Sequence, residues 1–294
     1  MTSLMFNKIH FPSVIGFNEV ELKELIQFID AQYREWDEIK LDKKTNLPKT
    51  YKDGTIKKRT IRPSKAKLNL VQKKTRKLIL SKIELPINVH GGRKKCSNIT
   101  NAKPHQGKKY ILTTDLKEFY PSVNHKTVYN TFIELGFNRQ TAYYLTRFTT
   151  WKKELPQGTP TSTDISNIIF LKTDLKLIKL CNERKITYTR YVDDLTFSAP
   201  IDFQDSIKEI LDIIRNSKLK ISWRKTIYSG NQTITGIVPL LNKITAPEKI
   251  LEKVEEEKLL PNGSQKPYTN YNNGIKKLSK QKKKLRAILI KVKV

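Results

Sequence analysis

The sequence predicts an α+β fold in which short strands alternate with amphipathic helices. Residues 110–115 form an apolar run that indicates a buried strand ending at Asp115. Residues 186–199 alternate in polarity around Asp193-Asp194, as expected of a β-hairpin with that pair at its tip. Helices are predicted at residues 124–136, 141–149, 162–179 and 204–216, and a further strand at residues 219–223. This order of elements is typical of a split βαβ-like antiparallel sheet.

The N-terminal part of the chain is predicted to be basic and partly helical. Residues 18–30 carry apolar side chains at helical spacing. Asp53-Gly54 is a type I′ turn signal within a basic β-hairpin that Pro63 ends. Residues 67–83 then indicate a cationic amphipathic helix, and from Pro247 onward the chain is predicted to be helical and charged.

The charge balance points to a polyanionic partner. The 294 residues include 57 Lys plus Arg against 28 Asp plus Glu, a formal net charge of +29. Because self-repulsion of this size opposes folding unless an anion offsets it, nucleic acid is the expected partner. An anionic membrane would attract the same chain, and an AT-rich genome also raises the Lys content. Charge alone therefore does not decide between these readings.

Cysteine usage and hydropathy favour a cytoplasmic protein. Cys96 and Cys181 are the only cysteines and form no CxxC pattern. This argues against a disulfide framework or a zinc site and fits a reducing cytosol. No stretch approaches 18 apolar residues, so neither a membrane span nor an export signal is expected.

Three aspartates form the candidate catalytic centre. Adjacent carboxylates such as Asp193 and Asp194 repel each other, so a fold keeps them together at a cost unless a cation lies between them. Asp115, at the end of another predicted strand, would add a third carboxylate. Mg²⁺ prefers such oxygen ligands, and two ions can serve in-line phosphoryl transfer. Most Asp-Asp pairs lie in solvated turns, but here the flanking strands and Asp115 favour a metal site.

Two further segments suit contact with a nucleotide. Residues 155–158, Leu-Pro-Gln-Gly, fix the backbone before a predicted helix and offer the amide of Gln157 to a nucleotide or template base. Tyr120 follows Asp115 closely, and its ring under a nucleotide sugar would clash with a 2′-hydroxyl group. Taken singly, these segments also suit an ordinary surface loop and core packing.

Four segments in order resemble the palm motifs A, B, C and D of reverse transcriptases. They are TDLKEFYPSV, LPQGTPTS, YTRYVDDLTFSA and WRKT. The YxDD form is typical of that class, whereas RNA-templated RNA polymerases usually carry GDD. The basic segment RTIRPS resembles the fingers motif, and the resemblance covers about residues 50 to 240. Four ordered motifs are far more specific than any one of them.

Two more motifs resemble retron-type bacterial reverse transcriptases. Residues 101–105, NAKPH, match an NAxxH signature, and Thr235-Gly236 occupies the place of a VTG motif, with Ile234 in place of Val. The chain departs from the pattern at residues 90–93, HGGR, where Gly-Phe is usual. It departs again at Val192, which replaces the commoner Ala of YADD.

The resemblance implies a right-hand polymerase with fingers at residues 1–106, a palm at residues 107–240 and a short basic thumb at residues 241–294. Its implied metal ligands are Asp115, Asp193 and Asp194, around two Mg²⁺ ions that Mn²⁺ can replace. Lys225 is implied to protonate or stabilise the leaving pyrophosphate. The implied nucleotide-binding residues are Arg59, Tyr120, Gln157 and Gly158. The implied nucleic-acid-binding residues are Asn101, His105, Tyr191, Lys276, Lys277, Lys280 and Lys284.

The retron resemblance also implies the partners. A cognate structured non-coding RNA would serve as template and primer, and synthesis from dNTPs would start at one of its 2′-hydroxyl groups. The product would be a branched RNA–DNA, and a separately encoded effector protein would act with it in anti-phage defence. The Lys-rich residues 276–293 lack Trp and Phe, which favours a helix tracking nucleic acid over one lying on a membrane.

Two alternatives stay open. Another prokaryotic defence reverse transcriptase, protein-primed or template-independent, would yield a deoxynucleotide tract or a peptide-linked product in place of branched RNA. An RNA-binding scaffold with a polymerase fold would make no DNA at all. The complete aspartate triad and Gln157 argue against the scaffold, because a scaffold has no use for three converging carboxylates.

Overall fold

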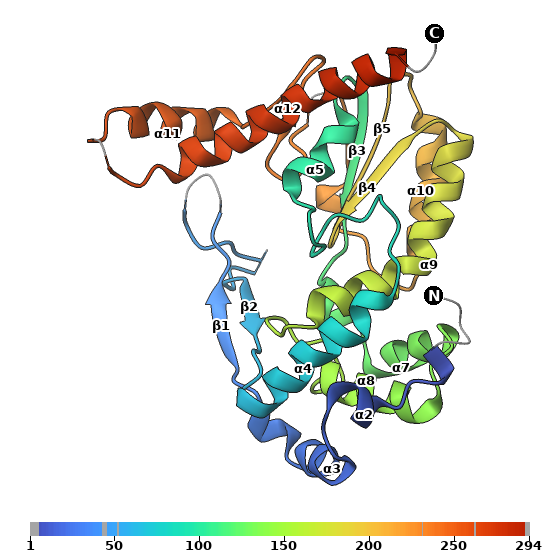
Figure 1. Cartoon of the computed structure of the whole chain (residues 1–294). Helices are drawn as coiled ribbons and strands as arrows, with labels where there is room; N and C mark the ends of the chain where they lie inside the picture. The colour runs from blue at the N-terminus through green and yellow to red at the C-terminus, as the bar shows by residue number, and fades with distance from the viewer. Residues whose placement is uncertain (1–5, 43–45, 52, 231, 262, 292–294) are drawn as a thin grey trace. The chain divides into compact units, whose positions relative to one another are not determined.

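The chain folds into two compact units. The computed structural model describes residues 6–42, 46–51, 53–230, 232–261 and 263–291, with side chains up to residue 279. Unit 1 comprises Met1–Leu85 and Glu118–Phe170, and unit 2 comprises Pro86–Lys117 and Leu171–Val294. Figure 1 shows the elements of both units. The predicted boundaries near residues 106 and 240 stay predictions.

Unit 2 is built on a four-stranded antiparallel sheet in the order β4-β5-β3-β6. The strands are β3 (Tyr110–Asp115), β4 (Thr187–Tyr191), β5 (Asp194–Ala199) and β6 (Ile227–Ser229). Figure 1 shows the first three side by side. β5 is buried from Leu195 to Ala199, which indicates that both faces of the sheet are covered. The remaining elements of unit 2 are α5 (Asn98–Ala102), η3 (Lys103–His105), α10 (Gln204–Arg215), η4 (Trp223–Lys225), β7 (Val238–Pro239), β8 (Ile244–Thr245), α11 (Glu248–Lys258) and α12 (Pro267–Lys291).

An apolar cluster joins the C-terminal helices of unit 2 to its sheet. Its buried members are Ile99, Ala102, Ile111, Ile234, Ile237, Ile244, Ala246 and Ile275. They come from α5, from β3 and from α12, so one cluster holds all three. Glu257 of α11 also accepts hydrogen bonds from the N–H groups of Tyr268 and Thr269, at 2.9 and 2.7 Å. This carboxylate caps the start of α12 and fixes the turn between the two helices.

Unit 1 is mainly helical and has one two-stranded sheet. Its elements are α2 (Phe11–Ile15), α3 (Glu19–Gln27), η1 (Ile29–Gln32), β1 (Trp36–Ile39), β2 (Lys58–Ile61), α4 (Ala66–Leu78), η2 (Leu80–Lys82), α6 (Phe119–Ser122), α7 (His125–Glu134) and α8 (Arg139–Thr149). A further helix, α9 (Ser162–Glu183), begins in unit 1 and ends in unit 2. Phe11 stacks on Tyr144 and Phe148 of α8, with ring centroids 5.3 and 5.7 Å apart. This aromatic stack anchors α2 on α8.

Several helices begin at the residues that the sequence indicated. Asn18 caps α3, where its side chain accepts a hydrogen bond from the N–H of Glu21 at 2.7 Å. Asn124 caps α7 in the same way, accepting from the N–H of Thr127 at 2.8 Å. The mixture of helices with an antiparallel sheet agrees with the predicted α+β class. No described helix is both long and apolar enough to span a membrane.

The strand predicted at residues 219–223 is wrong. That segment makes only a single bridge, between Ile221 and Leu116, and β6 forms the edge of the sheet in its place. The cause is η4, a tight turn that interrupts the extended backbone before pairing resumes at β6. The turn also brings Lys225 back toward the end of β3, with consequences for the site.

The predicted basic hairpin is only partly formed. Thr50 and Ile56 make one bridge across the Asp53-Gly54 turn, whereas β2 pairs with the upstream strand β1. Gly54 has a φ of 83°, and its N–H donates to the carbonyl oxygen of Tyr51 at 3.2 Å. The longer register with β1 explains why the turn contributes so little pairing.

Candidate active site

β3 and β5 place two of the predicted metal ligands opposite each other. The strands pair antiparallel with Asp115 facing Asp194, so both aspartates lie at the same end of the sheet. One further backbone bond extends the ladder, from the N–H of Leu116 to the carbonyl oxygen of Asp193 at 3.0 Å. The three aspartates therefore meet where the β4–β5 hairpin turns beside the end of β3.

Lys225 reaches the same place from η4. Its Nζ donates a hydrogen bond to Oδ1 of Asp115 at 2.7 Å, and the N–H of Ser222 donates to the carbonyl oxygen of Asp115 at 2.7 Å. The side chain of Asp115 is 8% exposed and that of Lys225 is 62% exposed. Water screens the lysine, so the ion pair adds only about 0–1 kcal/mol of stability. Its effect is positional, because it holds an ammonium group beside the carboxylates.

The carboxylates influence one another's protonation. Burial, together with the negative charges of Asp193 and Asp115, raises the pKa of Asp194 to about 7, and Lys225 offsets only part of this rise. Burial alone would lower the pKa of Lys225, but its bond with Asp115 and the nearby carboxylates raise it. Lys225 is therefore charged at neutral pH. A further cation would relieve the remaining repulsion between the carboxylates.

The donor set fits a hard divalent cation, although it is not a preformed cage. Carboxylate oxygens are the ligands that Mg²⁺ prefers, and the site holds more negative charge than Lys225 neutralises. Asp115 and Asp194 lie opposite each other in the register of β3 and β5. Across the part of the chain that the structure describes, no three His, Cys, Asp or Glu side chains are already arranged as metal ligands. Asp193, in the turn between β4 and β5, would complete the set.

Two residues that the sequence analysis did not single out hold this turn. Arg190 of β4 donates from Nη1 to the carbonyl oxygen of Val192 at 2.8 Å. The same guanidinium donates from Nε and Nη2 to the two carboxylate oxygens of Asp174 on α9, at 2.9 and 2.7 Å. Tyr188 donates to Asp174 as well, at 2.7 Å. The available signal was the position of Asp174 among Ile, Phe and Leu residues of a predicted helix, because a buried carboxylate needs a partner.

Gly91 lies against the catalytic turn. The preceding residues pair with β4, since the N–H of Arg190 donates to the carbonyl oxygen of Asn88 at 2.9 Å. A Cβ atom at Gly91 would lie 2.4 Å from the backbone nitrogen of Val192 and 2.5 Å from its Cγ2. Only glycine allows this close approach. The HGGR departure from the resembled pattern therefore has a structural use here.

Asn101 and His105, for which a contact with RNA was predicted, are fully buried. The two ring nitrogens of His105 lie 2.6 Å from Oγ of Ser198 and 2.7 Å from Oγ1 of Thr189. Burial, with smaller contributions from neighbouring charges, lowers the pKa of His105 to about 3. The neutral ring fastens η3 to β4 and β5. These bonds give His105 a structural role in unit 2, and its contact with nucleic acid stays a prediction.

The residues predicted to bind the nucleotide belong to unit 1. Tyr120 is half-buried, and its hydroxyl group lies 3.3 Å from Oγ1 of Thr163. The carbonyl oxygen of Gln157 accepts from the N–H of Arg62 at 2.7 Å, which fastens the LPQG loop next to β2. Gly158 has a φ of 104°. Arg59 lies on β2 and is exposed.

The remaining predicted contacts are surface residues or lie outside the described side chains. Tyr191 is half-buried and pairs with Asp194 in the hairpin. Lys276 and Lys277 are exposed on α12. Lys280 and Lys284 belong to the same helix, but their side chains lie outside the described residues.

Comparison with known proteins assigns the chain to a family. The family described as "Reverse transcriptase (RNA-dependent DNA polymerase)" matches residues 43–237. The chain belongs to the reverse transcriptase family. The matched residues include β3, which ends at Asp115, and the β4–β5 hairpin. Family membership also confirms the predicted polymerase fold.

Curated relatives of this family member include retron enzymes. The chain is 34% identical over 196 residues to the retron Ec86 reverse transcriptase of Escherichia coli, covering 63% of this chain and 60% of that protein. It is 30% identical over 248 residues to the retron Se72 reverse transcriptase of Salmonella heidelberg (strain 579083-10), covering 79% of this chain and 62% of that protein. The chain thus spans about three fifths of the length of both. The predicted resemblance to retron-type reverse transcriptases is confirmed.

A weaker likeness exists among solved structures. Telomerase from Candida albicans, in complex with a fragment of telomeric RNA, is 13% identical with a TM-score of 0.46, over 78% of this chain and 51% of that chain.

Proposed function

We propose that this reverse transcriptase is an RNA-directed DNA polymerase that copies a cognate structured RNA into DNA by two-metal catalysis. The observation that carries the proposal is the register of β3 and β5, which sets Asp115 opposite Asp194 at one end of the sheet. Lys225 adds a cation at the same point, 2.7 Å from Asp115. Carboxylates with an adjoining ammonium suit a reaction in which negative charge develops on phosphate oxygens.

In this proposal Asp115, Asp193 and Asp194 hold two Mg²⁺ ions, for which Mn²⁺ can substitute. The bound ions would activate the primer hydroxyl group and offset the charge of the triphosphate. Lys225 stabilises or protonates the leaving pyrophosphate, for which its raised pKa keeps it charged. Because the pKa of Asp194 is raised to about 7, catalysis benefits from any condition that keeps this group ionised.

Unit 1 is proposed to bind the incoming nucleotide. Tyr120 excludes ribonucleotides by the bulk of its ring, Gln157 and Gly158 contact the nucleotide, and Arg59 neutralises the triphosphate. The positions within unit 1 support this in two respects. Thr163 lies 3.3 Å from the Tyr120 hydroxyl group and restrains the ring. The carbonyl oxygen of Gln157 in the LPQG loop accepts from the N–H of Arg62, the residue after β2. Arg59 lies on β2.

The proposed substrate and product follow the retron relatives. A cognate non-coding RNA provides the template and a 2′-hydroxyl primer in the bacterial cytoplasm, and the product is a branched RNA–DNA that acts with a separately encoded effector in anti-phage defence. Tyr191 and the lysines of α12, namely Lys276, Lys277, Lys280 and Lys284, would contact the nucleic acid. Exposure of the first two lysines supports this assignment.

The experiment is to purify the protein from its native locus with bound nucleic acid and to treat it with RNase, DNase and debranching enzyme. We expect one DNA species joined to RNA, which shifts on debranching and is absent from Asp193→Asn. DNA without branched RNA would still support a polymerase, but one that belongs to another reverse-transcriptase lineage. Bound RNA with no DNA would overturn the polymerase in favour of a scaffold.

A further inference from the structure

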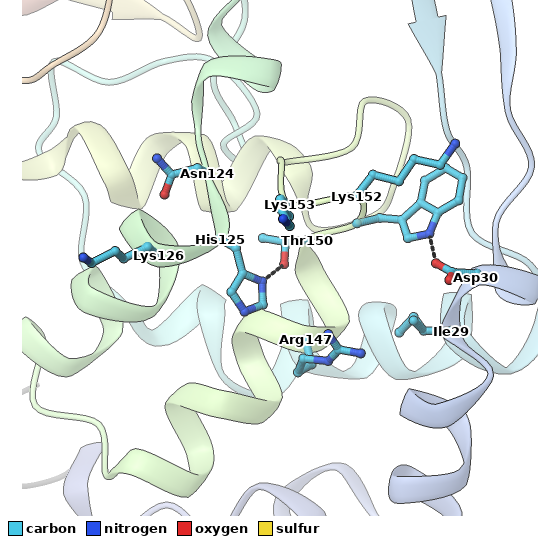
Figure 2. A pocket seen from close by; sticks show the side chains of 10 residues that line it. Ile29, Asp30, Asn124, His125, Lys126, Arg147, Thr150, Lys152 and Lys153 are labelled. Carbon is cyan, nitrogen blue, oxygen red and sulfur yellow. Dashed lines mark hydrogen bonds between the residues drawn. The ribbon is translucent and has the colours of Figure 1, made fainter.

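Unit 1 contains a cavity that none of the predicted nucleotide-binding residues lines. Its volume is about 610 Å³, within the range of sites that take small organic ligands. Figure 2 shows it between the start of α7, which carries His125, and the end of α8, which carries Arg147. Ile29 and Trp151 give it an apolar side. The cavity is large enough for a phosphorylated sugar with its base.

The charge of the lining is strongly positive. Four cationic side chains line the cavity, namely Lys126, Arg147, Lys152 and Lys153. Asp30 is its one carboxylate, and that group accepts a hydrogen bond from the indole nitrogen of Trp151 at 2.6 Å. Lys152 is paired with Glu35 at 2.9 Å. Among the described residues, no carboxylate forms an ion pair with the other three cations. An anion is therefore the complementary ligand.

Arg147 supplies the most specific signal. Its Nε is buried and has no hydrogen-bond partner among the described residues, and its Nη2 lies 3.5 Å from the carbonyl oxygen of Ile26, a long contact. The guanidinium makes no other hydrogen bond among the described residues, so a phosphate group in the cavity would pair with its charge.

His125 lies beside Arg147 with its ring fixed. Nδ1 lies 2.8 Å from Oγ1 of Thr150, as the dashed line in Figure 2 shows. Burial, and then the charge of Arg147, lower the pKa of this imidazole. The guanidinium therefore has an uncharged, oriented neighbour that does not compete with an anion for it.

The indole of Trp151 is not available for stacking on a base. Tyr33 stacks on it with ring centroids 4.5 Å apart, and the Nζ of Lys152 lies 4.5 Å from the ring centroid. Arg62 also lies over the ring, at 5.5 Å. The cavity would therefore recognise a ligand through its phosphate group and would not select the base.

We propose that this cavity binds the phosphorylated sugar of a nucleotide, with the phosphate held by Arg147 and Lys153. The nucleotide is either a residue of an RNA strand or a free mononucleotide, since both present the same group. The inference goes beyond the proposed polymerase activity and does not depend on it. None of the metal ligands or predicted nucleotide contacts takes part.

The test follows the ¹H–¹⁵N resonance of Arg147 Nε in the full-length protein during titration with uridine 5′-monophosphate. The peak is assigned by its loss in Arg147→Gln. We expect a saturable shift, with adenosine 5′-monophosphate binding within about threefold of uridine 5′-monophosphate. Lys153→Gln, an exposed change that spares the fold, should weaken binding about tenfold. Arg139→Gln removes the same charge from the other end of α8, outside the lining, and should leave affinity unchanged.

Three outcomes would overturn the proposal: no shift of the Arg147 resonance, binding of unphosphorylated uridine as tight as that of uridine 5′-monophosphate, or binding of inorganic phosphate as tight as that of the nucleotide. A decamer of uridine with a 5′-hydroxyl end separates the two sources. Displacement of the mononucleotide by the decamer identifies an RNA strand as the ligand. Failure of displacement identifies a free nucleotide.

Discussion

Asp174 and Arg190 form an ion pair in which both side chains are 0% exposed, with Oδ2 and Nη2 2.7 Å apart. The same guanidinium donates to the carbonyl oxygen of Val192, the residue before Asp193. Val192 is β-branched and has a φ of 59°, a left-handed conformation that costs about 1–2 kcal/mol. The buried pair thus links α9 to the strained turn that carries the catalytic aspartates.

We expect Arg190→Lys to slow nucleotide incorporation by about tenfold or more, because an ammonium cannot bond both Asp174 and Val192 in the geometry of a guanidinium. Single-turnover incorporation and urea unfolding would be measured together. Arg184→Lys is the matched control, since Arg184 is 56% exposed where it pairs with Glu209. A wild-type incorporation rate in Arg190→Lys would show that the turn does not depend on this guanidinium.

Removing the carboxylate has a different effect. Asp174→Ala leaves the buried charge of Arg190 unpaired, and we expect a loss of about 3–5 kcal/mol in the free energy of unfolding. Urea unfolding followed by circular dichroism measures this loss. A change below about 1 kcal/mol would mean that water or another acceptor compensates the arginine.

Gly91→Ala should damage the catalytic turn. The added Cβ would lie 2.4 Å from the backbone nitrogen of Val192, so the turn or the 88–91 segment must move. We expect a loss of about 1–3 kcal/mol in the free energy of unfolding and a fall in DNA synthesis. Gly274→Ala on α12 serves as control, because its Cβ would meet only Ile99, at 4.0 Å. Equal behaviour of the two variants would contradict the close approach at Gly91.

The stability of unit 2 should depend on pH through His105. Its pKa is about 3 in the folded chain and lies near 6.5 in an unfolded one, so the unfolded state binds more protons between these values. The contribution of His105 to stability is therefore complete above about pH 6.5 and falls as the pH drops, by roughly 1.4 kcal/mol per unit at the steepest. Asp194, whose pKa is raised to about 7, contributes a slope of opposite sign, so the part due to His105 is the difference between the wild type and His105→Gln. Urea unfolding from pH 7 to pH 4.5 would show the slope.

The control for this slope is a second histidine. His105→Gln should remove the His105 contribution and leave those of His90, whose pKa burial and Arg93 lower to about 4, and of Asp194, whose pKa is raised to about 7. His10→Gln changes an exposed residue and should leave the slope intact. An unchanged slope in His105→Gln would show that the buried imidazole is not its source.

Tyr120 offers a test of sugar selection. Tyr120→Ala removes the ring that is proposed to exclude a 2′-hydroxyl group, and the preference for dCTP over CTP in kcat/KM should fall by about tenfold or more. Tyr120→Phe loses only the 3.3 Å contact with Thr163 and keeps the ring, so it should retain the preference. An unchanged preference for dCTP over CTP in Tyr120→Ala would show that Tyr120 does not select the sugar.

Local patterns allowed the main strands and helices to be predicted. The apolar run ending at Asp115 and the alternation around Asp193-Asp194 correspond to β3 and to the β4–β5 hairpin. The capping residues Asn18 and Asn124 mark helix starts, because each satisfies a free N–H group of the first turn. These features depend on residues that are close together in the sequence, so the sequence alone predicts them.

Features that depend on distant contacts could not be predicted. The displaced strand at 219–223 reflects a turn that sequence alternation does not reveal. Gly91 is required because Val192, far along the chain, lies against it. The partners of Asp174 and the burial of His105 arise in the same way, from packing between elements. The order and spacing of the motifs predict the catalytic residues. The residues that support them can be identified only in the folded structure.

The central claim is that the carboxylates at the ends of β3 and β5 catalyse DNA synthesis. The most direct test is extension on a structured RNA template with dNTPs and Mg²⁺, comparing the wild type with Asp115→Asn and with Asp205→Asn, an exposed control on α10. We expect Asp115→Asn to lose at least about 10³-fold in rate while it still binds the RNA, and Asp205→Asn to match the wild type. Synthesis by Asp115→Asn at the wild-type rate would contradict the claim.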